Sequence, residues 1–193
     1  MSECHGGATT GNVGLAAGSV QPPAWRGFRP FRVSRKVQES ENVISLELEP
    51  TDRQSIAAAA PGQFVVLRLG RASCQALMRS YSLSGESGAS YYRVSVKREA
   101  HCTASTYLHK LQVGDILHAS AARANFTLRP GDTPVVLLSA GIGVTSVLAM
   151  LHPLAANAST REIWWLYGAR NGREYPFAEE THELLKALAR HHS

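Results

Sequence analysis

Hydrophobic and polar residues alternate through much of the chain between residues 28 and 120. The alternation is clearest in 43–49 and in 91–97, where an apolar residue stands at every second position. Since successive side chains of a strand point to opposite faces, this period predicts half-buried β-strands. Strands are predicted over the residue ranges 31–37, 43–49, 63–69, 79–83, 91–97 and 116–118.

Turn-forming and polar residues separate these predicted strands. Polar residues 38–42 predict a hairpin between the first two of them. One helix is predicted over 105–112, with Ser105 as its N-cap and with Leu108 and Leu111 on one face. Short strands at regular spacing, with turns between them, predict a closed antiparallel barrel, in which closure removes the exposed strand edges.

The pattern changes after Pro130. Residues 135–139 form a continuous apolar run, which is typical of a parallel strand buried on both faces. A helix is predicted over 146–151, a second buried strand over 163–167 and a last helix over 177–190. This order predicts a right-handed parallel crossover. The predicted fold class is all-β plus α/β: a six-stranded antiparallel barrel, followed by a partial doubly wound parallel α/β domain.

Three segments follow from these patterns. Residues 1–25 are rich in Gly, Ala, Ser and Thr and predict a flexible N-terminal arm. The barrel domain is expected over 26–130 and the α/β domain over 131–193. The arm could alternatively direct import into an organelle, but it has no arginine before Arg26, which argues against that role.

The composition limits the classes of function. The 193 residues carry a formal net charge of +5, spread along the chain without a Lys/Arg block, so nucleic acid is not expected as a partner. An acidic protein or a phosphorylated cofactor suits this charge. Cys4, Cys74 and Cys102 are odd in number and widely spaced, which fits a reducing compartment, and we expect the cytoplasm. No metal site and no membrane insertion are expected, and His191-His192 is interpreted as a polar tail.

Arg79-Ser80-Tyr81-Ser82 combines a cation, an aromatic ring and two hydroxyls on one short predicted strand. These groups suit a flat, polar ligand that carries phosphate. The alternative for the segment alone is a half-buried edge strand whose arginine reaches solvent.

The second candidate is Gly141-x-Gly143-x-Thr145, which follows a buried strand and opens a helix. Glycines there let the backbone approach a phosphate, and the helix N-terminus supplies free N–H groups. Ser146 stands where the full dinucleotide fingerprint has its third glycine. The alternative is a tight strand-to-helix turn without a ligand.

Taken in order, these motifs resemble the ferredoxin–NADP reductase superfamily, especially the reductase modules of flavohaemoglobins and of aromatic-oxygenase reductases. The resemblance runs from about Phe28 to the C-terminus. It is carried by segments 79–82, 94–98, 105–108, 141–145 and 167–170.

The resemblance implies FAD, in preference to FMN, with NAD(P)H as the substrate. Arg79 and Ser80 would bind the flavin, with Arg79 on a phosphate. Tyr81 and Ser82 would be the catalytic residues, with Tyr81 against the isoalloxazine and Ser82 near its reactive nitrogen. The other implied cofactor-binding residues are Val96, Lys97, Ser105 and Thr106 for the flavin, Gly141, Gly143 and Thr145 for the nicotinamide dinucleotide, and Arg170 near the adenosine ribose, where it could favour a 2′-phosphate.

Two departures from the family pattern accompany the resemblance. His101-Cys102 stands where the family commonly has two glycines, and side chains there would crowd the approach of a pyrophosphate. The chain also ends at Ser193, after two βα units, whereas the family's nucleotide domain continues. An unpaired apolar edge at 135–139 is therefore expected, and with it an association that covers the edge.

The resemblance implies a flavin-dependent oxidoreductase that passes electrons from NAD(P)H through FAD to a haem, iron–sulfur or ferredoxin-like protein, which we expect to be acidic. The alternative is a flavin-binding module, or a truncated product, without NAD(P)H turnover of its own. A scaffold barrel without a ligand would leave both motifs unexplained.

Overall fold

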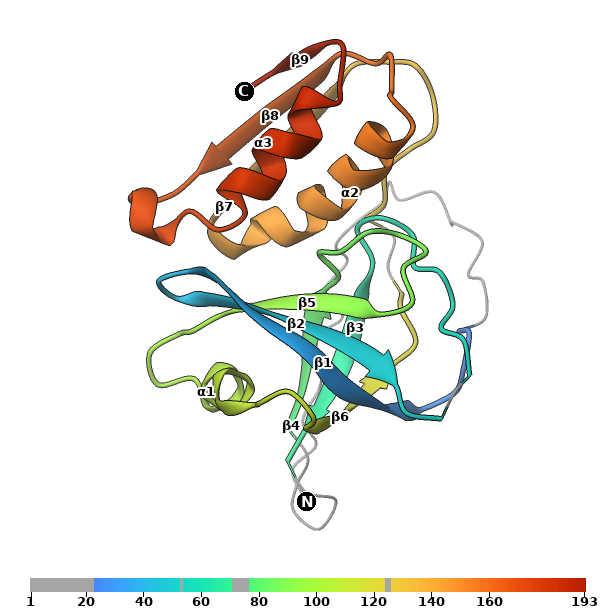
Figure 1. Cartoon of the computed structure of the whole chain (residues 1–193), viewed down its shortest axis with the longest axis vertical. Helices are drawn as coiled ribbons and strands as arrows, with labels where there is room; N and C mark the ends of the chain where they lie inside the picture. The colour runs from blue at the N-terminus through green and yellow to red at the C-terminus, as the bar shows by residue number, and fades with distance from the viewer. Residues whose placement is uncertain (1–22, 53, 71–76, 124–125) are drawn as a thin grey trace, which may run out of the picture.

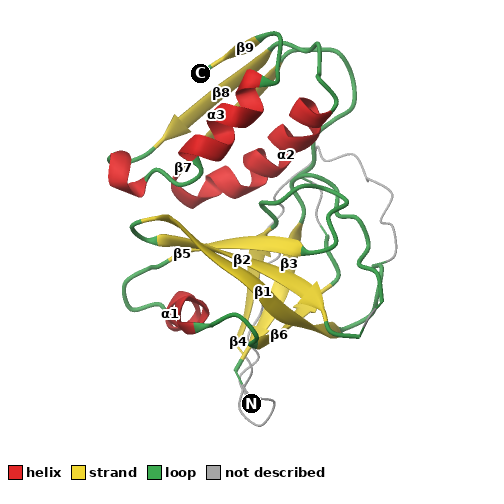
Figure 2. Ribbon diagram, viewed as in Figure 1, coloured by secondary structure: helices red, strands yellow, loops and turns green. Residues whose placement is uncertain are grey.

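The computed structural model describes residues 23–52, 54–70, 77–123 and 126–193. They form two parts, a β-sheet structure and a smaller layer of parallel strands and helices (Figure 1 and Figure 2). Most of the predicted flexible arm, together with Cys4 and Cys74, lies outside the described residues. The boundary near residue 130 stays a prediction, although the chain passes from one part to the other after β6.

The first part is one antiparallel sheet of six strands in the spatial order β4-β3-β6-β1-β2-β5. The strands are β1 (Phe28–Ser40), β2 (Val43–Pro50), β3 (Phe64–Leu69), β4 (Leu77–Ser82), β5 (Tyr92–Lys97) and β6 (Ile116–Ser120). Alternate apolar side chains of these strands meet in one core, including the fully buried Phe31, Leu46 and Leu67. The period-2 pattern thus predicted strands such as β3, in which buried residues alternate with half-buried ones, whereas β4 has no buried residue and the first four residues of β2 are all buried.

The two outer strands of this sheet approach each other without forming a ladder. A single antiparallel bridge joins Leu83, just after β4, to Val94 of β5. The next residue, Ser84, donates its backbone N–H to the carbonyl of Arg93 at 2.9 Å. The predicted antiparallel arrangement is therefore confirmed, and the sheet curls towards a barrel whose last contact is this bridge.

Helix α1 (Thr103–Lys110) begins earlier than predicted. Its N-cap is Cys102, so the prediction that Ser105 caps the helix is wrong. Ser105 lies in the first turn, where its Oγ accepts a hydrogen bond from the N–H of Glu99 (3.2 Å) and donates one to the carbonyl of Cys102 (3.3 Å). The hydroxyl thus ties the loop before the helix to its first turn.

The second part is a parallel sheet in the order β7-β8-β9, with the helices in between along the chain. It consists of β7 (Val135–Ala140), the 3-10 turn η1 (Gly141–Gly143), α2 (Val144–Ala156), β8 (Ile163–Gly168), η2 (Gly172–Glu174), α3 (Ala178–Lys186) and β9 (His191–His192). Two predictions need correction here. Helix α3 ends at Lys186 rather than at 190, and His191-His192 is not a tail but pairs with Ile163 and Trp164.

Strands β7 and β8 are buried on one face only, so the prediction of burial on both faces is wrong. Alternate residues point away from the helices and are exposed, namely Val136, Leu138, Trp164 and Leu166. Val136 pairs with Trp164 and Leu138 with Leu166, which makes one continuous apolar surface. We call these four side chains the open face. Within the described sheet β7 is also an edge strand, as expected.

The described residues contain no helix long and apolar enough to cross a membrane. Nor do they contain a cluster of three or more His, Cys, Asp or Glu side chains that could hold a metal ion.

Candidate functional site

A pocket of about 320 Å³ lies where the barrel meets the start of α2. It is lined by Ser80, Tyr81 and Ser82 of β4, by Ser95 and Lys97 of β5, by Glu99, Cys102 and Ser105 around the start of α1, and by Ile142, Gly143 and Thr145, which lie in η1 and the first turn of α2. We call this pocket the barrel pocket and residues 141–145 the glycine turn. Seven of the predicted site residues therefore meet in one place, although they come from four separate segments of the chain.

The barrel pocket is walled by hydroxyls, one ammonium group and an aromatic ring. Tyr81 is half-buried, and burial raises the pKa of its hydroxyl; Cys102 adds to that rise, while Arg79 opposes it. The phenol is therefore neutral at physiological pH, and its ring offers an apolar wall. The Cys102 thiol has a lowered pKa, chiefly because of the backbone N–H of Ser105; burial opposes this, and the nearby charge of Arg79 lowers the pKa further.

In the turn before α1, His101 adopts a backbone conformation that is typical of glycine. His101 has φ +62°, a left-handed conformation that glycine adopts freely and other residues adopt at a cost. Its side chain is exposed, whereas Cys102 is half-buried in the pocket wall. The crowding expected from His101-Cys102 therefore concerns Cys102 more than His101.

A second pocket, of about 440 Å³, lies at the carboxyl ends of β7 and β8. It is lined by Asn42, Val43, Lys97, Ala140, Gly141, Ile142, Tyr167, Gly168, Ala169, Arg170, Glu174 and Pro176. We call it the sheet-end pocket. In open parallel sheets, ligands bind at the carboxyl ends of the strands, which is where this pocket lies.

The two glycines of the turn differ in what requires them. Gly141 has φ +52°, so its conformation favours glycine. Gly143 has φ −59°, and a Cβ built on it would meet no atom within 4 Å. Neither conformation nor packing explains Gly143, and the predicted approach of a ligand to the backbone there stays a prediction.

Two residues that line the sheet-end pocket carry unpartnered polar atoms. Asn42 Oδ1 and Tyr167 Oη are buried, and neither has a hydrogen-bond partner among the described residues. Buried polar atoms are normally paired, but both atoms are closed to solvent, so a ligand would reach them only if neighbouring side chains moved. Lys97 and Ile142 line both pockets, which makes the two pockets neighbours along one surface.

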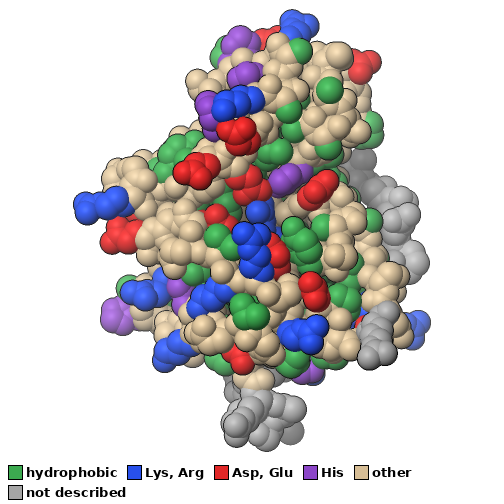
Figure 3. All heavy atoms as spheres, viewed as in Figure 1, with side chains coloured by type: hydrophobic (Ala, Val, Ile, Leu, Met, Phe, Trp, Pro, Cys, Tyr) green, Lys and Arg blue, Asp and Glu red, His purple; other side chains and the backbone are tan. Residues whose placement is uncertain are grey.

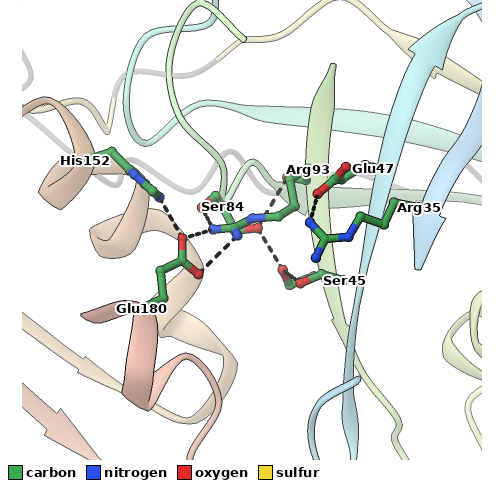
Figure 4. Close-up of polar contacts among 8 residues, drawn as sticks. Arg35, Ser45, Glu47, Ser84, Arg93, His152 and Glu180 are labelled. Carbon is green, nitrogen blue, oxygen red and sulfur yellow. Dashed lines mark hydrogen bonds and ion pairs between the residues drawn. The ribbon is translucent and has the colours of Figure 1, made fainter. Parts of the chain in front are cut away.

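A polar network joins the two parts of the molecule (Figure 4). Arg93 of β5 donates to both carboxylate oxygens of Glu180 on α3, at 3.0 and 2.7 Å, and its guanidinium lies 5.6 Å from the ring centre of Phe177. His152 of α2 lies 2.9 Å from the same carboxylate. Arg93 also donates to the carbonyl of Ser84, so the ion pair anchors the segment that follows β4.

Comparison with known proteins identifies both parts. Residues 30–128 match the family model of the oxidoreductase FAD-binding domain, and residues 137–193 match that of the oxidoreductase NAD-binding domain. The chain belongs to the ferredoxin–NADP reductase superfamily. The barrel pocket thus lies mainly in the FAD-binding domain, and the sheet-end pocket lies mainly in the NAD-binding domain.

Relatives agree with this assignment. A flavohemoprotein of Deinococcus radiodurans is 42% identical over 172 residues, which are 87% of this chain and 42% of that protein. The flavohem-like FAD/NAD binding domain of nitric oxide dioxygenase from Vibrio cholerae matches with a TM-score of 0.80 and 35% identity, over 86% of this chain and 73% of that domain. Flavohemoglobin from Malassezia yamatoensis, solved with bound FAD and heme, matches with a TM-score of 0.79 and 27% identity. The match covers 86% of this chain and 44% of that protein. The chain spans less than half the length of the curated relatives it matches.

Three residues assigned to FAD by resemblance lie outside the lining of the barrel pocket. Arg79 is exposed, and its Nη1 donates to the carbonyl of Met78 at 2.8 Å. Thr106 is exposed on α1. Val96 is buried, and its carbonyl is bonded to His109 Nε2 at 2.9 Å. The roles assigned to these three, as to the other site residues, stay predictions.

The sequence interpretation did not select several residues of the two pockets. Ser95 stands two positions before Lys97 on β5, so the strand period places it on the same face, and this relation could have identified it. Asn42 and Glu174 gave no such indication. They reach the sheet-end pocket because the β1–β2 hairpin packs on η2, where the N–H of Glu41 donates to the carbonyl of Arg173 at 3.1 Å.

Proposed function

We propose that the chain is the reductase part of a flavin-dependent oxidoreductase, which passes electrons from NAD(P)H through FAD to a one-electron acceptor protein. The observation that carries this proposal is the junction itself, where the barrel pocket and the sheet-end pocket adjoin and share Lys97 and Ile142. A flavin in one pocket and a nicotinamide in the other would be neighbours, which hydride transfer requires.

FAD, once bound, supplies the chemistry, since it accepts a hydride and releases single electrons. The chain supplies position and electrostatics. Arg79 would bind a phosphate of the flavin with its planar fork of donors, and Tyr81 would lie against the ring system. The Ser82 hydroxyl would donate a hydrogen bond near the reactive nitrogen. The predicted contacts of Ser80, Val96, Lys97, Ser105 and Thr106 with the flavin, and of Gly141, Gly143, Thr145 and Arg170 with the dinucleotide, belong to the same proposal.

Steady-state turnover tests the proposal. The purified chain is loaded with FAD, and NADH- or NADPH-dependent reduction of ferricyanide is measured. We expect turnover that depends on added FAD and that Tyr81→Ala together with Ser82→Ala reduces strongly. A chain that stays colourless with excess FAD would contradict the proposal.

A second function, a flavin-binding module without turnover, is favoured by the open face. Val136 and Leu138 are 60% and 69% exposed, so the NAD-binding part exposes an apolar surface to solvent, which is unfavourable. A yellow protein whose colour neither dinucleotide removes would support this function over the first.

For the acceptor we propose an acidic protein that carries haem or an iron–sulfur centre. Haem is supported by the flavohaemoglobin likeness, and acidity by the net charge of +5. Figure 3 shows Lys and Arg side chains spread over the viewed face of both parts and interspersed with Asp and Glu. The rate of electron transfer to such an acceptor should fall as salt is added.

Two further proposals concern the state of the protein in the cell. We propose that copies of the chain associate and so cover the open face and the β7 edge. Light scattering tests this, because Leu138→Asp should lower the measured mass to that of one chain. The cysteine pattern supports a cytoplasmic location, which cell fractionation checks.

A further inference from the structure

Three buried serines form a continuous chain of hydroxyl groups at the edge of the barrel pocket. They are Ser45 of β2, Ser95 of β5 and Ser84, which follows β4, and each is at most 3% exposed. Ser95 Oγ lies 2.7 Å from Ser45 Oγ and 2.7 Å from Ser84 Oγ. Figure 4 labels the two outer serines, with Ser84 beside Arg93. Of these three serines, Ser95 is the one that lines the barrel pocket.

The contacts of Ser84 set the direction of the hydrogen bonds in this chain. Ser84 Oγ also lies 3.3 Å from the backbone carbonyl oxygen of Arg93, and in that contact only the hydroxyl can donate. Because a hydroxyl has one proton, Ser95 must then donate to Ser84, and Ser45 must donate to Ser95. The proton of Ser95 is therefore engaged, and its oxygen keeps one acceptor site for a group in the pocket.

Ser82 offers the same pocket a donor. It accepts a hydrogen bond from Ser146 at 3.0 Å, so its own proton remains available. The antiparallel bridge between Leu83 and Val94 sets a register in which Ser95 stands opposite Ser82. Leu83 and Val94 point into the barrel core, so both serines lie on the other face of their strands. A donor and an acceptor thus stand side by side in the pocket wall.

The oxidised isoalloxazine ring carries matching groups along one edge. Its reactive nitrogen N5 accepts a hydrogen bond, the C4 carbonyl follows, and the imide N–H is the one donor of the ring. We have placed the Ser82 hydroxyl near the reactive nitrogen. An acceptor beside that hydroxyl suits the imide N–H, which would otherwise be buried without a partner.

We propose that Ser95 accepts a hydrogen bond from the imide N–H of the bound flavin, and that Ser84 is the positioning residue that holds Ser95 in this orientation. The inference rests on the proposed function, because it assumes that the barrel pocket binds the flavin ring. Ser95 is not among the flavin contacts that the resemblance implies.

The test compares FAD with an FAD analogue that is methylated at the imide nitrogen and therefore has no imide N–H. Fluorescence titration gives the dissociation constant of the chain for each flavin, and the readout is the preference for FAD over the analogue. Ser95→Ala should weaken FAD binding about threefold to tenfold, as expected for one neutral hydrogen bond. Binding of the analogue should stay equal or become stronger, so the preference should fall by at least the same factor.

Two further variants test the direction of the chain. Ser84→Ala removes the acceptor of the Ser95 proton, so Ser95 can turn and donate, and the preference for FAD should fall as it does in Ser95→Ala. Ser45→Ala removes only a donor to Ser95 and should change the preference little. Adding Ser84→Ala to Ser95→Ala should lower the preference no further, because Ser84 acts through Ser95.

The matched control is Ser34→Ala. It removes a hydroxyl of β1 that donates to the carbonyl of Glu47 at 3.3 Å and that does not line the barrel pocket, so the preference should stay unchanged. A preference that Ser95→Ala does not lower, or that Ser45→Ala lowers more than Ser84→Ala does, overturns the inference while the proposed function stands. If the unchanged chain binds neither flavin, the proposed function fails as well.

Discussion

Ser146 in the first turn of α2 donates a hydrogen bond to the hydroxyl of Ser82 at the end of β4, with 3.0 Å between the two oxygens. The bond joins the NAD-binding part to a hydroxyl that lines the barrel pocket. Because Ser82 accepts in this bond, its own proton remains available for a second bond. The residue that replaces the third glycine of the fingerprint thus orients a hydroxyl for which we predict a role beside the flavin.

The first prediction is that Ser146→Ala impairs flavin reduction more than flavin binding. One neutral hydrogen bond contributes about 0.5–1.5 kcal/mol, so the rate of reduction by NADH should fall about threefold to tenfold, with a shifted flavin potential. FAD affinity should change little, and Ser146→Thr should restore the rate. An unchanged rate and potential in Ser146→Ala would show that the bond has no part in the reaction.

The second prediction concerns FAD affinity. Arg79 is exposed and forms no ion pair among the described residues, so its guanidinium is free to bind an anion. A hydrogen bond to a charged group contributes about 1.5–3 kcal/mol, and Arg79→Ala should therefore weaken FAD binding about tenfold to hundredfold. Fluorescence titration measures this. The control is Arg32→Ala, which removes an exposed arginine of β1 that lies beside Glu49 of β2. This control should leave the FAD affinity unchanged.

The third prediction is that the pair of Arg93 and Glu180 stabilises the junction of the two parts. Their side chains are 14% and 26% exposed, so truncating Arg93 leaves a largely buried carboxylate with His152 as its remaining partner. Arg93→Met should lower the free energy of unfolding by about 1.5–3 kcal/mol. Chemical denaturation measures the change. The control is Arg35→Met, which removes an exposed guanidinium from an ion pair with Glu47. If both variants lose the same free energy of unfolding, the pair of Arg93 and Glu180 stabilises the protein no more than a surface ion pair does.

The same pair predicts how stability depends on pH. Burial raises the pKa of the Glu180 carboxyl, but hydrogen bonds from His152 and Arg93 lower it by more, so its pKa lies below the ordinary value. A depressed pKa in the folded protein means stability that is present above the unfolded value, about 4.3, and is lost as the pH falls through the folded value. Glu180→Gln should flatten this loss as the pH falls below about 4.3. An equally steep curve in Glu180→Gln would assign the loss to other carboxyls.

The fourth prediction is that His101→Gly stabilises the protein. The backbone there has φ +62°, which costs a residue with a Cβ about 1 kcal/mol relative to glycine. The melting temperature should rise, and FAD affinity should stay equal or increase, since the turn lies beside the barrel pocket. A lower melting temperature would mean that the exposed His101 side chain makes a contact that offsets the strain.

The fold was predictable from the sequence where the determining pattern is local. Alternation within six or seven residues was enough for the strands of the sheet, and a glycine turn between an apolar run and a helix was enough for the α/β part. The open face of β7 and β8 was not predictable this way, because one-sided burial depends on which elements lie across the sheet. The pairing of His191-His192 with β8 was missed for the same reason, since a two-residue strand has no period.

The candidate site divides along the same line. Arg79-Ser80-Tyr81-Ser82 and the glycine turn were visible as motifs, and the structure brings most of their residues to two adjoining pockets. The bond from Ser146 to Ser82 crosses 64 positions of the sequence, and Lys97 meets Glu174 across 77. Contacts of this kind arise only when the two parts pack together, so neither Glu174 nor the role of Ser146 could be found from spacing.

The central claim is that one junction holds a flavin within reach of a nicotinamide. Rapid anaerobic mixing of the FAD-loaded chain with NADH tests it most directly, with the visible absorption of the flavin as the readout. The account predicts that the absorption disappears in a single rapid phase whose rate saturates with NADH concentration. A yellow protein whose absorption persists, with either NADH or NADPH, would contradict it.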